Sequence, residues 1–256
     1  MILTNGKNSA FDALFGFHWK DQSLSPQTLI YCSTLNWLKA LKKVTKNIRK
    51  IHIHLGITVL KNSKRVILIT GTPCIGKTST ARFLAVKLNA LHINLGELVK
   101  KEGMSIGVDE LRDTVIADME KLRMRVQEII RDADSDVIVD GHFAMHVVPP
   151  KMVHKIFVVR REPAELKELM EKKGYVGRKL WENLAAEILD ICLTDALSVC
   201  RNEKVCEIDA TGRKPNEVAN EILLILEGKK PCRVGVVDWL GELDAKGRLE
   251  EFLKDF

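Results

Sequence analysis

The chain has 256 residues, with 40 Lys and Arg against 34 Asp and Glu, which makes a formal net charge of +6. Hydrophobic residues make up 46% and charged residues 29% of the chain, so the composition excludes a disordered or collagen-like protein. No apolar run approaches the ~18 residues that a membrane-spanning helix needs, and the first ten residues lack the pattern of a secretory signal. The composition predicts an intracellular, cytoplasmic protein without membrane contact.

The first quarter of the chain differs from the rest in charge and in aromatic content. Residues 1–65 hold 11 Lys and Arg against 2 Asp and Glu, a net charge of +9, and six of the 14 aromatic residues. Helical spacing over 25–50 is followed by strand-like alternation over 51–59. Three interpretations of this basic N-terminal extension are open: an arm that binds ribosomal RNA, a helix packed on the main domain with solvated lysines, and an over-extended reading frame.

Six cysteines are scattered without any Cys-x-x-Cys pair: Cys32, Cys74, Cys192, Cys200, Cys206 and Cys232. Such spacing indicates neither a zinc site nor a disulfide framework. We therefore expect reduced, mostly buried thiols and no structural metal.

A short, β-branched apolar run over 66–70 leads directly into a phosphate-loop motif. Residues 71–79 read Gly-Thr-Pro-Cys-Ile-Gly-Lys-Thr-Ser, which matches G-x-x-x-x-G-K-T/S, and a helical pattern follows over 80–89. Main-chain N–H groups and the helix N-terminus would hold a polyphosphate, while Lys77 bridges the β- and γ-phosphates and Thr78 binds Mg²⁺. The predicted ATP-binding residues are Gly71, Thr72, Pro73, Cys74, Ile75, Gly76, Lys77, Thr78 and Ser79.

A second apolar strand, over 136–140, ends in Asp140. A carboxylate at the carboxyl end of a strand beside the phosphate loop suits Mg²⁺, usually through a water molecule. We assign Asp140 to the metal; the alternative is a strand-end aspartate that caps the following turn.

Phosphoryl transfer also requires cations around the transferred group, preferably on a segment that closes over it. Arg160 ends an apolar strand over 156–159, on the same edge as the phosphate loop. A helix over 162–173 then leads to residues 174–179, Gly-Tyr-Val-Gly-Arg-Lys, which have the glycines of a hinged lid. We predict that Arg160, Lys173 and Arg178 act on the transferred group, with the lid at about 173–182.

Three motifs resemble a known family. Gly71-Thr72-Pro73, Asp140-Gly141-His142 and Lys173-Gly174-Tyr175 look like the adenylate kinase isoenzyme 6 family, of the coilin-interacting nuclear ATPase type, in an archaeal-like form. The resemblance covers about 66–240 and leaves 241–256 as a C-terminal tail. Ordinary adenylate kinases have Asp-Gly-Phe-Pro-Arg after this strand, whereas this chain has Asp140-Gly141-His142-Phe143 without that arginine, so it matches the sixth isoenzyme better than the main family. One departure is Lys173, which stands where family members commonly have arginine, so the bidentate fork is lost.

The resemblance implies phosphoryl transfer between ATP and AMP or dAMP with Mg²⁺, a slow ATPase activity, and a role in small ribosomal subunit maturation and rRNA processing. It further implies binding to universal small-subunit ribosomal protein eleven. His142 would act in hydrolysis and coupled motion. Lys214 would lie near the adenine of ATP, or else cap the helix that follows. The acceptor nucleotide is expected over about 94–112, read as a short helix, a loop and another helix start, with candidate contacts Asn94, Leu95, Gly96, Glu97 and Arg112.

Five strand–helix alternations predict an α/β protein with the fold of P-loop nucleoside monophosphate kinases: a five-stranded parallel sheet with helices on both faces. Its ligands would collect at the carboxyl ends of the strands. Three functions are open at this point. They are a nucleoside monophosphate kinase, a ribosome-assembly ATPase switch whose kinase activity is secondary, and a small-molecule or shikimate-like kinase on the same scaffold.

Overall fold

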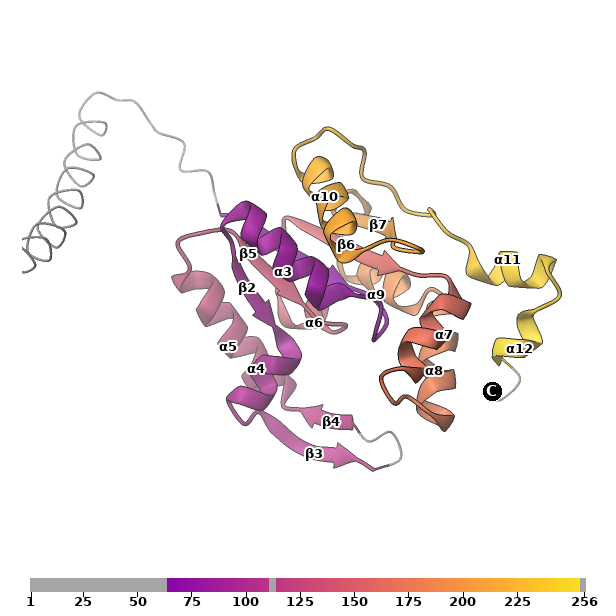
Figure 1. The fold of residues 1–256 in the computed structure, drawn as a ribbon. Helices are drawn as coiled ribbons and strands as arrows, with labels where there is room; N and C mark the ends of the chain where they lie inside the picture. The colour runs from indigo at the N-terminus through magenta and orange to yellow at the C-terminus, as the bar shows by residue number, and fades with distance from the viewer. Residues whose placement is uncertain (1–63, 111–113, 254–256) are drawn as a thin grey trace, which may run out of the picture. The chain divides into compact units, whose positions relative to one another are not determined.

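The computed structural model describes residues 64–110 and 114–253; residues 1–63 of the predicted N-terminal extension and Arg112 lie outside them. The five strands of the main sheet are separated along the chain by one or more helices (Figure 1). One parallel sheet has the order β2-β5-β1-β6-β7, which confirms the predicted fold class. Its strands are β1 (Val66–Thr70), β2 (Leu91–Asn94), β5 (Val137–Asp140), β6 (Lys155–Arg160) and β7 (Val205–Asp209).

The central strand β1 is buried at every residue, because helices cover both faces of the sheet. Its register pairs Ile69 with Asp140 of β5, and Asp140 in turn pairs with Asn94 of β2. The carboxyl ends of three neighbouring strands therefore lie level with one another, beside the loop that follows β1.

Two hydrophobic cores fill the spaces between the sheet and its helices, and β1 contributes Ile67 and Ile69 to one and Val66 and Leu68 to the other. The first core is covered by α3 (Lys77–Leu88), α7 (Pro163–Glu171), α8 (Gly177–Ile188) and α10 (Pro215–Leu226). The second is covered by α5 (Met119–Asp132), α6 (Ala144–Val147) and α9 (Ile191–Val199). None of the helices in residues 64–110 and 114–253 combines the length and the apolar character that a bilayer-spanning helix requires.

A β-hairpin occupies the segment expected to bind the acceptor nucleotide. After α4 (Leu95–Lys101), strands β3 (Ser105–Asp109) and β4 (Thr114–Ala117) pair antiparallel and project from the body of the domain (Figure 1). The prediction of another helix start is wrong, because the β-branched residues of both strands favour the extended conformation. Its apolar side chains are exposed: Ile106, Val108, Val115 and Ile116.

The chain after α10 packs on the first core. Trp239 and Leu243 of α11 (Trp239–Ala245) and Phe252 of α12 (Leu249–Leu253) are buried there, so the boundary expected after residue 240 lies inside a helix.

Cys206 and Cys232 form a disulfide, so the expectation of reduced thiols is wrong for this pair. Cys206 lies in β7, which follows the 3-10 turn η1 (Asn202–Lys204), and Cys232 lies 26 residues further on. The chain returns along β7 after α10, where the Glu207 N–H donates to the carbonyl of Arg233 at 2.8 Å. Only this return brings the two thiols together. Cys74, Cys192 and Cys200 are free thiols.

Candidate active site

The backbone of the phosphate loop has the shape that its glycines predict. Gly71 has φ +136°, and a Cβ atom there would lie 2.4 Å from the carbonyl oxygen of Val159, so only glycine fits. Gly76 precedes α3 in the left-handed region, and no side chain caps that helix. The first N–H groups of α3 are therefore available to an anion at the loop.

Lys77 begins α3 and its side chain folds back over the loop. Its Nζ donates to the carbonyl oxygen of Thr72 at 2.7 Å. Burial lowers the pKa of Lys77, and the Cys192 thiol and the Asp140 carboxylate counteract this. The ammonium group thus lies at the loop before any ligand arrives.

Asp140 is 1% exposed and is surrounded by polar partners. One carboxylate oxygen accepts from the Thr78 hydroxyl at 2.7 Å and from the Asn94 amide at 2.9 Å, and the other lies 2.5 Å from His92 Nε2. A carboxylate beside a hydroxyl is an oxygen donor set that suits Mg²⁺. No group of three or more His, Cys, Asp or Glu side chains is arranged for a metal within residues 64–110 and 114–253. Phosphate and water oxygens would have to complete the coordination.

Sequence reasoning missed His92 and assigned Asn94 only to the acceptor. Both residues lie in β2, the strand next to β5, and one residue separates them. Side chains two positions apart point to the same face of a strand. The alternation His92-Ile93-Asn94 was the available signal, but it identifies a site only once β2 is known to lie beside Asp140.

Arg160 does not face the phosphate loop, contrary to the prediction. It is 1% exposed, and its guanidinium donates to Glu187 at 2.8 Å, to Asp190 at 2.5 Å and to Glu207 at 2.6 Å. We call these four residues the Arg160 cluster. Because three carboxylates hold the guanidinium inside the fold, we withdraw Arg160 as a ligand of the transferred group.

The next residue, Arg161, approaches the loop instead. Its Nη2 lies 3.5 Å from the carbonyl oxygen of Ile75 and within 4.0 Å of where a Cβ of Gly76 would stand, and Nη1 pairs with Glu165. Arg161 Nε is buried without a hydrogen-bond partner among the described residues. Arg161 is thus a basic group behind the loop that the sequence did not distinguish from its neighbour.

The lid residues lie on the surface, with Lys173 in the turn between α7 and α8 and Arg178 at the start of α8. Arg178 pairs with Glu182 at 2.7 Å rather than with the phosphate loop. Gly174 and Gly177 both have positive φ, as a hinge between the helices allows. Tyr175 approaches the Cys74 thiol, and burial together with that thiol raises the pKa of Tyr175. The turn therefore contacts the loop through Tyr175, whose ring also lies 5.0 Å from the Nζ of Lys179, while Arg178 pairs with Glu182.

His142 follows Asp140 at the mouth of the site. Its carbonyl oxygen accepts from the Thr70 hydroxyl at 3.2 Å, which fixes the backbone of this turn. Partial desolvation, with the nearby charge of Lys77, lowers the pKa of His142 to about 4, although the residue keeps substantial exposure to solvent. The imidazole is therefore neutral at physiological pH.

Within the described residues, the candidate acceptor contacts and Lys214 stabilise the ends of helices, lie in the core or are exposed on the surface. Asn94 caps α4 by accepting from the Glu97 N–H at 2.7 Å, Leu95 is buried, and Glu97 pairs with Arg82 on the surface. Lys214 occupies the position before α10, where its backbone N–H donates to the Glu217 carboxylate at 2.7 Å and its side chain makes no capping hydrogen bond.

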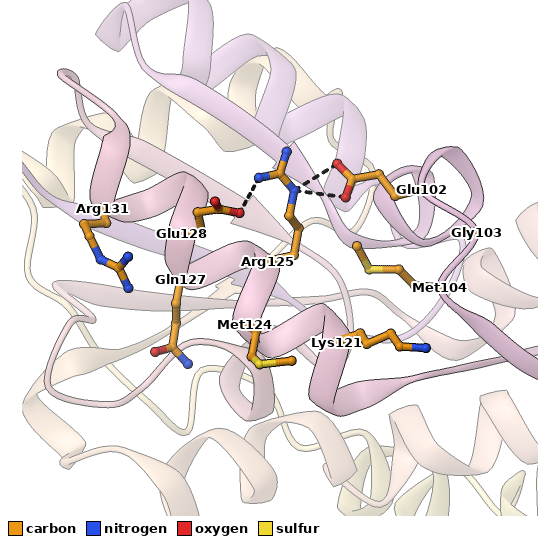
Figure 2. A pocket seen from close by; sticks show the side chains of 9 residues that line it. All are labelled: Glu102, Gly103, Met104, Lys121, Met124, Arg125, Gln127, Glu128 and Arg131. Atoms are coloured by element: carbon orange, nitrogen blue, oxygen red, sulfur yellow. Dashed lines mark hydrogen bonds and ion pairs between the residues drawn. The ribbon is translucent and has the colours of Figure 1, made fainter.

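A hollow of about 660 Å³ lies apart from the phosphate loop, between the end of α4 and α5 (Figure 2). Arg125 at its centre pairs with Glu102 at 2.9 Å and with Glu128 at 2.6 Å. Because the lining mixes three basic with two acidic side chains, their charges largely offset one another, and we place no site there.

The fold and the loop define a P-loop nucleotide-binding protein of the kinase type. A family model described as "AAA domain" matches residues 67–190. Proteins named "Putative adenylate kinase" from Thermococcus onnurineus and Methanocaldococcus jannaschii are 35% and 39% identical to the chain, over 70% and 68% of it and 93% and 92% of their own lengths. The solved structure of a shikimate kinase from Acinetobacter baumannii matches 66% of this chain and 96% of its own length, at 14% identity and a TM-score of 0.48.

The chain therefore belongs to the archaeal family of adenylate kinase-like proteins represented by these two relatives.

Proposed function

We propose that the protein transfers the γ-phosphoryl group of ATP to AMP or dAMP. The observation that carries this proposal is the arrangement of Lys77, Thr78 and Asp140 at the level carboxyl ends of β1 and β5, within a chain related to adenylate kinase-like proteins. The main chain of 71–79 would hold the triphosphate, and Lys77 would neutralise charge on its β- and γ-phosphates. Thr78 and Asp140 would hold Mg²⁺, which screens the phosphate oxygens when bound.

In the proposed reaction an oxygen of the acceptor phosphate attacks the γ-phosphorus in line and forms the new P–O bond, while the bond to the β-phosphate oxygen breaks and ADP leaves. Two nucleoside diphosphates result, and no covalent enzyme intermediate is needed. Lys173 and Arg178 would approach the transferred group only after the lid closes over it. The acceptor would lie between α4 and the β3–β4 hairpin, where Gly96, Glu97 and Arg112 were predicted to contact it.

The second candidate is an ATPase that uses the same site, with a role in small ribosomal subunit maturation through a ribosomal protein and rRNA. One observation favours hydrolysis: His142 is neutral at the mouth of the site, so its ring can accept a hydrogen bond from a water molecule. The arginine that follows the aspartate in ordinary adenylate kinases is absent from this turn.

One experiment tests the proposal and separates it from the alternatives. ADP formation from ATP is measured with the full chain alone and with AMP, dAMP, other nucleoside monophosphates or shikimate. We expect AMP or dAMP to raise the rate most, and Lys77→Ala to abolish it with little change in unfolding temperature. A rate that no acceptor raises would identify the ATPase alternative, and near-normal turnover of Lys77→Ala would overturn the assignment of the site.

A further inference from the structure

Glu187, in the last turn of α8, is a buried carboxylate that joins three parts of the fold. Its Oε1 accepts from Arg160 Nε at 2.8 Å, from the backbone N–H of Arg161 at 3.1 Å and from the indole Nε1 of Trp239 at 3.3 Å. Its Oε2 accepts from the Thr72 hydroxyl at 2.5 Å. Because Glu187 is 1% exposed, these donors replace the hydrogen bonds that water would otherwise make to the carboxylate.

The two oxygens of Glu187 have different partners. Oε1 is held by β6 and α11, whereas Oε2 holds the phosphate loop. Ionised carboxylates only accept hydrogen bonds, so the hydroxyl proton of Thr72 points to Glu187 and away from any ligand. The carbonyl oxygen of Thr72 accepts from Lys77 at 2.7 Å. Thr72 therefore links the buried carboxylate to the lysine of the loop.

The chain that follows α10 completes this arrangement. Glu207 of the Arg160 cluster accepts from the N–H of Val236 at 2.6 Å, and its own N–H donates to Arg233. The same segment, residues 229–239, ends at Trp239, whose indole reaches Glu187. The Glu187 carboxylate thus links the C-terminal part of the domain to the phosphate loop.

We propose that Glu187 is a positioning residue for the phosphate loop, and that Trp239 completes its set of donors. Holding Thr72 fixes the loop before the nucleotide arrives, so less ordering is needed on binding. This inference rests on the proposed ATP-dependent function and adds to it the residues that set the affinity of the loop for the triphosphate.

The test measures Mg·ATP binding by calorimetry and the unfolding temperature on the full chain. Glu187→Gln and Thr72→Val should weaken ATP binding about tenfold, since the first replaces a charge-assisted hydrogen bond by a weaker neutral one and the second removes the bond. Thr72→Ser, which restores the hydroxyl, should regain most of the affinity lost in Thr72→Val. The matched control is Glu207→Gln, because Glu207 is equally buried and pairs with Arg160 but does not touch the loop.

We expect Glu207→Gln to lower the unfolding temperature as much as Glu187→Gln does, yet to bind ATP within about twofold of the unsubstituted chain. Affinities that fall in proportion to the unfolding temperature in all variants would overturn the inference, because Glu187 would then act only on stability. Normal affinity in Glu187→Gln would overturn it as well. An unsubstituted chain that binds no ATP would refute the proposed function itself, and the inference with it.

Discussion

The phosphate loop and the β3–β4 hairpin, proposed to bind the two nucleotides, are built in opposite ways. Around the loop, Asp140 is 1% exposed and its carboxylate already contacts Thr78, Asn94 and His92. On the hairpin, Ile106 is 68% and Val108 57% exposed. The loop side is packed and hydrogen-bonded, whereas the hairpin presents apolar side chains to solvent.

This difference indicates whether the phosphate loop and the hairpin adopt their ligand-binding conformations before or after the ligand binds. A loop held by buried partners is preorganised and binds without much rearrangement. A projecting hairpin with few buried contacts has low local stability and can close over a ligand. We therefore expect substitutions on the loop side to change rate and stability, and substitutions on the hairpin to change mainly the Michaelis constant of the acceptor.

Asp140→Asn gives the largest expected effect, because it removes the charge that would hold Mg²⁺ while keeping the shape of the side chain. We expect ADP formation to fall ~10³-fold, as the metal supplies several kcal/mol of charge stabilisation. Initial rates of ADP formation at increasing Mg²⁺ concentration measure this fall. Asp136→Asn, which replaces the partner of Arg65 next to the other end of β5, serves as the control and should leave the rate within about twofold. A loss below tenfold in Asp140→Asn would contradict the metal assignment.

The second prediction concerns the disulfide, which ties the segment after α10 to β7 and so contributes to the stability of the domain that holds the phosphate loop. Removing a cross-link between residues 26 apart should lower the free energy of unfolding by ~3 kcal/mol. Urea denaturation of a Cys206→Ala/Cys232→Ala variant measures the loss, and Cys200→Ala, which removes a free thiol, is the comparison. Equal midpoints with and without reductant in the unsubstituted chain would show that the bridge adds no stability.

Val108→Ser tests the hairpin. Losing an exposed apolar contact with the acceptor should raise its Michaelis constant about fivefold, corresponding to ~1 kcal/mol, with the Michaelis constant of ATP unchanged. Steady-state kinetics with each substrate varied separates the two. Val86→Ser on α3, which is 84% exposed, removes a similar side chain away from the hairpin and should change neither constant. An equal rise in the Michaelis constants of ATP and of the acceptor would contradict the assignment of the hairpin to the acceptor alone.

His142 gives the smallest expected effect, on the pH dependence of stability, because the residue is exposed and solvent screens its charge. Its folded-state pKa of about 4 lies below the ordinary value of 6.5, so the unfolded chain binds more protons between these pH values. The free energy of unfolding should therefore fall as the pH decreases from 6.5 to 4, and His142→Gln should show less of this fall. Urea denaturation at several pH values compares the two chains, and identical profiles would mean that the neighbourhood of Lys77 does not hold His142 neutral.

The phosphate loop could be found in the sequence because its phosphate-binding residues are consecutive. Gly71 and Gly76 indicate the backbone conformation that the loop adopts. Asp140 followed from the end of an apolar strand. Arg160 was misjudged although its strand was correctly located, since Glu187 and Glu207, far apart in sequence, draw the side chain into the fold. His92 was missed because its partner lies on a neighbouring strand.

The sequence by itself determined the parallel α/β architecture, the position of the phosphate loop and the strand that carries Asp140. Each of these depends on interactions within a few residues, such as hydrophobic periodicity, the conformational freedom of glycine and adjacent polar groups. Only the tertiary structure decided that Arg160 is internal, that Arg161 approaches the loop, that Cys206 meets Cys232 and that Glu187 holds Thr72. Those outcomes depend on which distant segments share a buried space, where a charge or a thiol must find its partner among whatever the fold places beside it.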